Sequence, residues 1–108
     1  MPRPRRTRRI FFNPRITYFK PAGIPVSDLK ESVITKDELE AIRLIDFEET
    51  EQKKAAEQMK ISQPTLSRLL AGARKKISDA LVNGNAIKIE GGDYEFVHKR
   101  RRARRFLF

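Results

Sequence analysis

The chain has 108 residues, 39% of them hydrophobic and 35% charged, which favours one compact and soluble domain with a modest core. It has no Cys, which excludes disulfides, thiolate catalysis and cysteine metal sites, and no apolar run of the roughly 20 residues that a membrane-spanning helix needs. The basic N-terminus lacks the apolar segment of a signal peptide, so we expect a cytoplasmic protein.

The net charge of +10 is concentrated at the two ends. Residues 1–20 carry seven Arg or Lys and no acid, and residues 98–108 carry six Arg or Lys and no acid. These two ends have a combined charge of +13, so residues 21–97 carry a net charge of −3. We therefore divide the chain into a basic N-terminal arm, 1–20, a folded body, 21–97, and a basic tail, 98–108. Arg outnumbers Lys in both ends, which suits bidentate phosphate contacts and favours nucleic acid as the partner. A membrane surface is less favoured, because the Arg runs do not alternate with apolar residues at helical spacing.

The N-terminal arm begins with a Pro- and Arg-rich stretch, residues 1–9, whose composition predicts disorder. Two short β-prone runs follow, Ile10–Phe12 and Ile16–Phe19, separated by the turn signal Asn13-Pro14. The prolines of residues 21–25 predict an irregular connection to the body.

The first helix is predicted from Thr35, which forms a capping box with Glu38, to about Phe47. Asp37 and Glu38 complement the positive end of the helix dipole. The apolar face of this helix consists of Leu39, Ile42, Leu44 and Ile45. The residues expected on its solvated face are Glu40, Arg43 and Asp46.

Two further helices are predicted in the next 34 residues. Thr50 is expected to cap a helix at about 51–60, and Ser62 to cap a longer one that ends at about Asn83, with Pro64 in its first turn. Gly84 favours a left-handed end to the longer helix. The apolar stripe of the shorter helix is Ala55, Ala56 and Met59, and that of the longer one is Leu66, Leu69, Leu70, Ala73, Ile77, Ala80 and Leu81.

Beyond the third helix, Ala86–Glu90 and Asp93–Val97 read as two strands joined by a tight turn at Gly91-Gly92. We expect this β-hairpin, or wing, to pair with the strand at Ile16–Phe19. The predicted fold class is mainly α: a three-helix, helix-turn-helix domain with a small β-hairpin and a short N-terminal β-arm.

The segment from about Thr50 to Asn83 has the pattern of a helix-turn-helix. Ala56 is small enough for the next helix to cross closely, and Ile61 fills the angle between the two helices. Lys60 departs from the pattern, because such turns usually place Gly there to allow a positive φ.

The stretch AAEQMKISQPTLSRLL resembles the helix-turn-helix of sigma-factor region four and related bacterial regulators. The opening MPRPRR, and the segments YFKPAGIP, DELEAIRLID and IKIEGG, resemble a prokaryotic family of small proteins described as predicted DNA-binding. The resemblance covers about residues 1–92 and implies a DNA-binding role without a defined target. It places Ser62 at the cap of the recognition helix.

The candidate DNA contacts fall into two groups. Those expected to read base edges in the major groove are Gln63, Thr65, Ser67 and Arg68. Those expected to bind phosphates are Ser62, Arg74, Lys75, Lys76, Arg3, Arg5, Arg6, Arg8 and Arg9. A solvated helix face would look the same as the group at residues 74–76, and polar residues at 63, 65 and 67 also favour helix starts by themselves.

The sequence thus predicts sequence-specific binding of double-stranded DNA and transcription regulation. The alternatives are RNA or ribosome binding, and a protein-interaction module that docks on the transcription machinery. No nucleophile–base pair, metal-ligand spacing or phosphate-cradling loop appears, so we expect no enzyme and no cofactor, metal or small-molecule ligand. A homodimer through the apolar N-terminal strands or Phe106–Phe108 is compatible with the sequence, which defines no interface.

Overall fold

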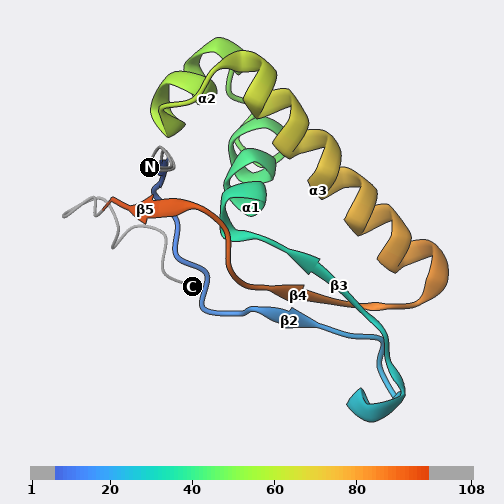
Figure 1. Ribbon diagram of the computed structural model, residues 1–108. Coiled ribbons are helices and arrows are strands. Elements are labelled where there is room, and N and C mark those ends of the chain that lie inside the picture. Colours follow the sequence, from blue (N-terminus) through green and yellow to red (C-terminus); the bar gives the residue numbers. More distant parts are fainter. Residues whose placement is uncertain (1–6, 98–108) are drawn as a thin grey trace, which may run out of the picture.

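The computed structural model describes residues 7–97 and contains three α-helices and two small sheets (Figure 1). The helical elements are η1 (Val26–Asp28), α1 (Lys36–Ile42), its π-helical continuation η2 (Arg43–Phe47), α2 (Gln52–Met59) and α3 (Gln63–Asn83). The strands are β1 (Arg8–Ile10), β2 (Tyr18–Phe19), β3 (Glu31–Ile34), β4 (Ala86–Ile89) and β5 (Tyr94–Phe96). The three predicted helices are therefore confirmed, together with β-structure near both ends of the described chain.

Local signals set the helix ends. At α1 the capping box is complete: Glu38 N donates to Thr35 Oγ1 at 3.3 Å, and Thr35 N donates to Glu38 Oε1 at 3.0 Å. At α3 the Ser62 side chain accepts from Thr65 N at 3.2 Å, and Gly84 ends the helix in the left-handed conformation with φ 70°.

The prediction that Thr50 caps α2 is wrong. The N-cap residue is Glu51, and its side chain makes no capping hydrogen bond. Thr50 N instead donates to Leu44 O at 2.8 Å, directly after Glu49, whose left-handed conformation with φ 58° turns the chain back toward η2. The second helix consequently begins without a side-chain cap.

The main core lies where α1, η2, α2 and α3 meet. Its fully buried residues are Ala41, Leu44, Ala55, Ala56, Met59, Leu66 and Leu70. The prediction that Leu81 belongs to it is wrong, since this side chain is 75% exposed. Ala80 is the buried residue of this part of α3, and Leu81, which points about 100° further around the helix, faces solvent.

The three-stranded sheet has the order β2-β4-β3. β2 is antiparallel to β4, with Tyr18 opposite Lys88, which confirms the expected pairing of the 16–19 segment with the strand after α3. β3 is parallel to β4 and was not predicted from the sequence. Tyr18 reaches over this sheet to donate to Glu31 Oε2 at 2.8 Å, and that hydrogen bond raises the pKa of the phenol.

The predicted hairpin of β4 and β5 is wrong. β5 instead pairs in parallel with β1, with Arg8 opposite Tyr94, in a separate two-stranded sheet. Gly91 and Gly92 have φ 76° and 107°, and Gly91 O accepts from Lys36 N at 2.9 Å. The two glycines therefore route the chain past the start of α1, from one sheet to the other, and do not close a tight turn.

The first strands of the chain are integrated into this fold. Residues 7–20, which the sequence assigns to a basic arm, contribute β1 and β2, and each pairs with a strand that follows α3. Residues 1–6 and 98–108, with Arg3, Arg5, Arg6 and the predicted tail, lie outside the described residues.

Candidate nucleic-acid interface

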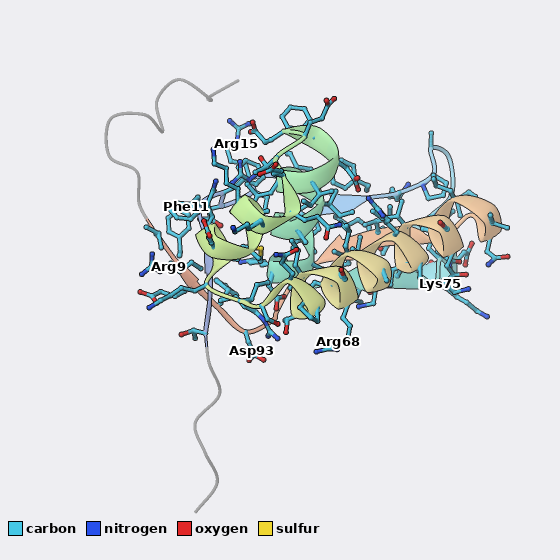
Figure 2. The ribbon with its side chains drawn as sticks, turned by 90° about the horizontal axis from the view of Figure 1, so that it is seen from above. Arg9, Phe11, Arg15, Arg68, Lys75 and Asp93 are labelled. Carbon is cyan, nitrogen blue, oxygen red and sulfur yellow. The ribbon has the colours of Figure 1, made fainter. Side chains whose placement is uncertain are left out.

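The outward face of α3 carries the predicted reading residues. Gln63, Ser67, Arg68 and Lys75 are all exposed. Arg68 and Lys75 are seven residues apart, about two helical turns, and Figure 2 shows both side chains on the same side of α3. Neither makes a hydrogen bond or ion pair with another residue of the described chain. Their charges are available to a partner.

The polar residues at the very start of α3 are engaged with each other. Ser62 Oγ donates to Thr65 Oγ1 at 2.9 Å while it accepts from the Thr65 backbone N–H. Thr65 is half-buried. Of the four predicted reading residues, Gln63, Ser67 and Arg68 are thus the more accessible.

The cations at 74–76 do not form one surface. Arg74 makes two hydrogen bonds to Asp46 of η2, at 3.2 and 2.6 Å, and these, with the charge of that carboxylate, raise the pKa of the guanidinium. Lys76 Nζ donates to both carboxylate oxygens of Glu38, at 2.8 and 3.1 Å. Lys75, between them, is exposed and forms no ion pair with an acid of the described residues.

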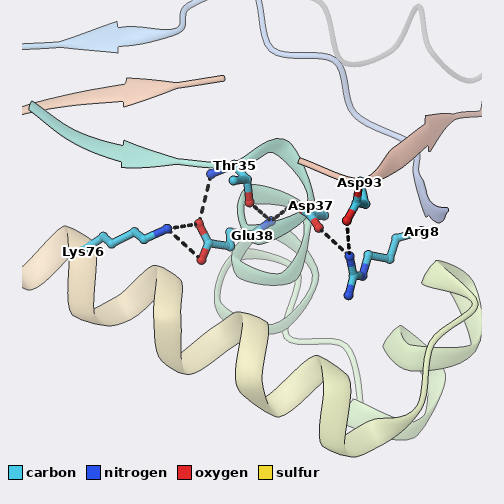
Figure 3. Close-up of polar contacts among 6 residues, drawn as sticks. All are labelled: Arg8, Thr35, Asp37, Glu38, Lys76 and Asp93. Atoms are coloured by element: carbon cyan, nitrogen blue, oxygen red, sulfur yellow. Dashed lines mark hydrogen bonds and ion pairs between the residues drawn. The ribbon is translucent and has the colours of Figure 1, made fainter. Parts of the chain in front are cut away.

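The described N-terminal arginines also differ from each other. Arg8 Nη1 donates to Asp37 Oδ2 at 3.3 Å and to Asp93 Oδ2 at 3.4 Å, so its guanidinium is bound within the fold (Figure 3). Arg9 is half-buried on β1. The other arginines predicted to bind phosphates, Arg3, Arg5 and Arg6, lie outside the described residues.

Three acids of α1, Asp37, Glu38 and Glu40, are buried, and the expectation that Glu40 lies on a solvated face is wrong. Asp37 and Glu38 hold Arg8 and Lys76, and Glu40 is 1% exposed. Glu40 accepts from Phe11 N at 3.0 Å and from the Arg43 guanidinium at 3.1 and 2.8 Å. A buried carboxylate is tolerated only with such partners, so these acids join the N-terminal strand and α3 to α1.

The candidate contacts predicted from the sequence did not include three exposed lysines on α2 and in the turn before α3. Lys53 and Lys54 lie in the first turn of α2, and Lys60 lies in the turn that follows this helix. Cations at a helix start oppose the helix dipole, and α2 has no acid in its first turn. The first turn of α2 thus carries two exposed cations and no acid.

Two findings describe residues 7–97 as a whole. No group of three His, Cys, Asp or Glu side chains there is arranged to hold a metal ion. No helix of that range is long and apolar enough to cross a membrane.

A family model described as "Protein of unknown function DUF134" matches residues 1–97. A UPF0251 protein of Caldanaerobacter subterraneus subsp. tengcongensis is 55% identical over 95 residues, which cover 88% of this chain and 80% of the relative. Another, of Thermoanaerobacter sp. strain X514, is 49% identical over 105 residues, 97% of this chain and 93% of the relative. No solved structure matches. The chain therefore belongs to the DUF134 family, together with bacterial relatives named UPF0251 proteins.

Proposed function

We propose that this chain binds double-stranded DNA through a helix-turn-helix made by α2, the turn at residues 60–62 and the first turns of α3. Lys60 is left-handed, with φ 60°, and Ser62 caps α3, so the two helices are joined by a three-residue turn. Ala56 and Leu66 are buried where the helices cross. A short turn that presents the second helix outward is typical of this motif, and the resemblance to sigma-factor region four supports the same reading.

The observation that carries the proposal is the outward pair Arg68 and Lys75. Both are exposed on one side of α3 and neither is neutralised by an acid of the described chain (Figure 2). A guanidinium in the first turns of a recognition helix suits the O6 and N7 acceptors of guanine. An ammonium two turns further along suits the phosphate backbone as it leaves the groove.

The neighbouring polar side chains complete the proposed surface. Gln63 and Ser67 are exposed on the first turns of α3, where they would meet base edges in a major groove about 12 Å wide. Lys53 and Lys54 at the start of α2, and Lys60 in the turn, would contact phosphates on the flanks. A reader of this kind regulates transcription by occupying a promoter.

The test is an unbiased selection of bound fragments from a genomic DNA library at physiological salt. The parent is compared with Gln63→Ala/Arg68→Ala and with a matched control, Gln58→Ala/Lys20→Ala. Gln58 is exposed on α2, and Lys20 is an exposed cation that directly follows β2, a strand at the opposite end of the molecule from α2 (Figure 1). We expect a sequence motif from the parent and the control that is absent with the α3 variant.

Three outcomes would contradict the proposal. Tight, salt-sensitive binding of every fragment with no motif would assign binding to the basic ends of the chain. Equal affinity for structured RNA, or capture of a protein partner that survives nuclease treatment, would favour RNA binding or docking on the transcription machinery.

A further inference from the structure

The C-terminal end of α3 presents the dipeptide Asn83-Gly84 to solvent, at the opposite end of this helix from α2 (Figure 1). The other two Asn residues of the chain, Asn13 and Asn85, precede Pro and Ala. Deamidation begins when the backbone nitrogen of the next residue attacks the carbonyl carbon of the Asn side chain, and Gly has no side chain to hinder that attack. A Cβ built at Gly84 would meet no described atom within 4 Å. Asn83 is therefore the Asn of this chain most suited to deamidation.

The reaction consumes water and releases ammonia. Gly84 N forms a bond to Asn83 Cγ as the bond from Cγ to Nδ2 breaks, and the Gly84 N–H proton leaves with Nδ2 as ammonia. Water then opens the resulting cyclic imide at either of its two carbonyl carbons. One opening gives aspartate at position 83, and the other gives isoaspartate, in which the main chain runs through the former side-chain carbon. Both products carry a carboxylate in place of a neutral amide.

Both reacting groups are held by hydrogen bonds in the folded chain. The Gly84 N–H donates to Ala80 O, and Asn83 Nδ2 donates to Asp79 Oδ1 at 2.6 Å. Because helical side chains lean toward the N-terminus of their helix, the second bond keeps the Asn83 amide on the preceding turn, away from Gly84 N. Attack of this nitrogen on Asn83 Cγ therefore requires the last turn of α3 to open.

The Asp79 carboxylate keeps this turn closed and joins it to the sheet. Its Oδ2 atom accepts from Ser32 Oγ of β3 at 3.4 Å and from Asn85 Nδ2 at 3.3 Å. Apolar packing adds little here, since Leu81 and Val82 are 75% and 81% exposed. Helix ends open locally at a lower free-energy cost than helix centres, so loss of the Asp79 hydrogen bonds raises the population of the open turn.

The products of the reaction do not fit the closed turn. A carboxylate at position 83 has no N–H to donate to Asp79, and it places a second negative charge where the amide now lies 2.6 Å from Asp79 Oδ1. A negative charge in the last turn also opposes the helix dipole. Isoaspartate in addition lengthens the main chain by one carbon ahead of Gly84, which disturbs the hydrogen bond of Gly84 N to Ala80 O.

We propose that Asn83-Gly84 is a deamidation site controlled by Asp79. The Asp79 hydrogen bonds keep the closed turn unreactive, opening of the turn exposes the pair to reaction, and the carboxylate that forms keeps the turn from closing again. Deamidation thus releases the C-terminal end of α3 from Ser32 of β3, whereas the start of α3 keeps its Ser62 cap. This modification site is independent of the proposed DNA binding.

The rate of deamidation tests the control by Asp79. The full chain is incubated in mildly alkaline buffer, and peptide mapping by mass spectrometry follows the amide, aspartate and isoaspartate forms of each Asn. The parent is compared with Asp79→Ala, which removes an exposed side chain, and with the control Ser78→Ala, an exposed neighbour whose hydroxyl donates to Arg74 O. We expect Asn83 to react about threefold faster or more in Asp79→Ala than in the parent and the control, the ratio expected from a lost hydrogen bond.

Two results of this experiment would overturn the proposal. Equal rates at Asn83 in the parent and in Asp79→Ala, with circular dichroism showing both folded, would remove the control by Asp79. Reaction of Asn85 or Asn13 as fast as that of Asn83 in the folded parent would remove the site itself.

The effect of the product is tested with Asn83→Asp and a matched control, Asn13→Asp, which adds the same charge at another exposed Asn. We expect Asn83→Asp to lower the Tm by about 4–8 °C, and Asn13→Asp to change it by less than about 2 °C. In the Asp79→Ala background, Asn83→Asp should lower the Tm by less than about half as much, because the opposing carboxylate is gone. An equal lowering in both backgrounds would overturn the claim that the product acts against Asp79.

Discussion

The two sides of α3 carry cations in opposite surroundings. On the side facing α1, Lys76 donates to both oxygens of Glu38, a buried carboxylate. On the outward side, Arg68 and Lys75 form no ion pair with an acid of the described chain. The cations of α3 therefore fall into two sets. One set binds buried acids within the fold, and the other is exposed to solvent.

This difference teaches which charges are structural. A buried acid costs several kcal/mol if its cation is removed, whereas an exposed cation contributes little to folding. Residues of the first kind are expected to change stability, and residues of the second kind to change binding. Four substitutions test that division.

Glu40→Ala should lower the free energy of unfolding by about 3–5 kcal/mol, because it removes the buried carboxylate that accepts from the Phe11 N–H and leaves the Arg43 guanidinium with Glu48 alone as its acceptor. Urea denaturation measures the change. Glu57→Ala, at an exposed position of α2, is the control and should change stability by no more than about 0.5 kcal/mol. Equal effects of the two substitutions would show that burial of α1 acids is not what stabilises the fold.

Arg68→Ala should weaken binding to the selected duplex by about 1–3 kcal/mol and relax the preference at one base pair, with the unfolding free energy unchanged within about 0.5 kcal/mol. Fluorescence anisotropy on the duplex and its single-base variants measures both effects. A uniform loss over all sequences would make Arg68 a phosphate contact, and a loss of stability would place it among the structural cations.

Lys60→Gly should stabilise the fold by roughly 1 kcal/mol, because a non-glycine residue at φ 60° is strained. If Lys60 also binds phosphate, the same variant should bind DNA with a salt slope smaller by about 0.9. Thermal unfolding and a salt titration separate the two terms. A destabilised variant would contradict the left-handed turn.

Asp46→Asn should have the smallest effect. It removes the carboxylate that binds Arg74, at an exposed position where such a pair adds little to stability. The released guanidinium is available to a phosphate, so the slope of log K against log salt should become steeper by about 0.9. An unchanged slope would show that Arg74 lies outside the DNA surface.

Features encoded over a few residues could be predicted from the sequence. The capping box at Thr35 and Glu38, the Ser62 cap and the left-handed Gly84 each depend on neighbours within four residues. The turn between α2 and α3 also depends on a few neighbouring residues, and Lys60 adopts the positive φ that its position in the pattern implies.

Features that depend on distant partners could not. β1 and β5 are three residues each and carry no register of their own, and their pairing is fixed by Arg8 and by the path of Gly91 and Gly92 around α1. The acids of α1 look like a solvated face until the cations that bury them, from residue 8 and residue 76, are brought beside them. For the same reason, the sequence could not show that Arg74 and Lys76 bind acids within the fold whereas Lys75 does not.

The most direct measurement is an NMR titration of the isotope-labelled protein with the selected duplex. We predict that the largest shift changes among residues 7–97 fall at residues 53–54, at the turn 60–62 and along α3 at residues 63–68 and 75, while the amides of β3 and β4 change little. Changes centred on the sheets, with α3 unaffected, would contradict the account that the outward face of α3 reads DNA.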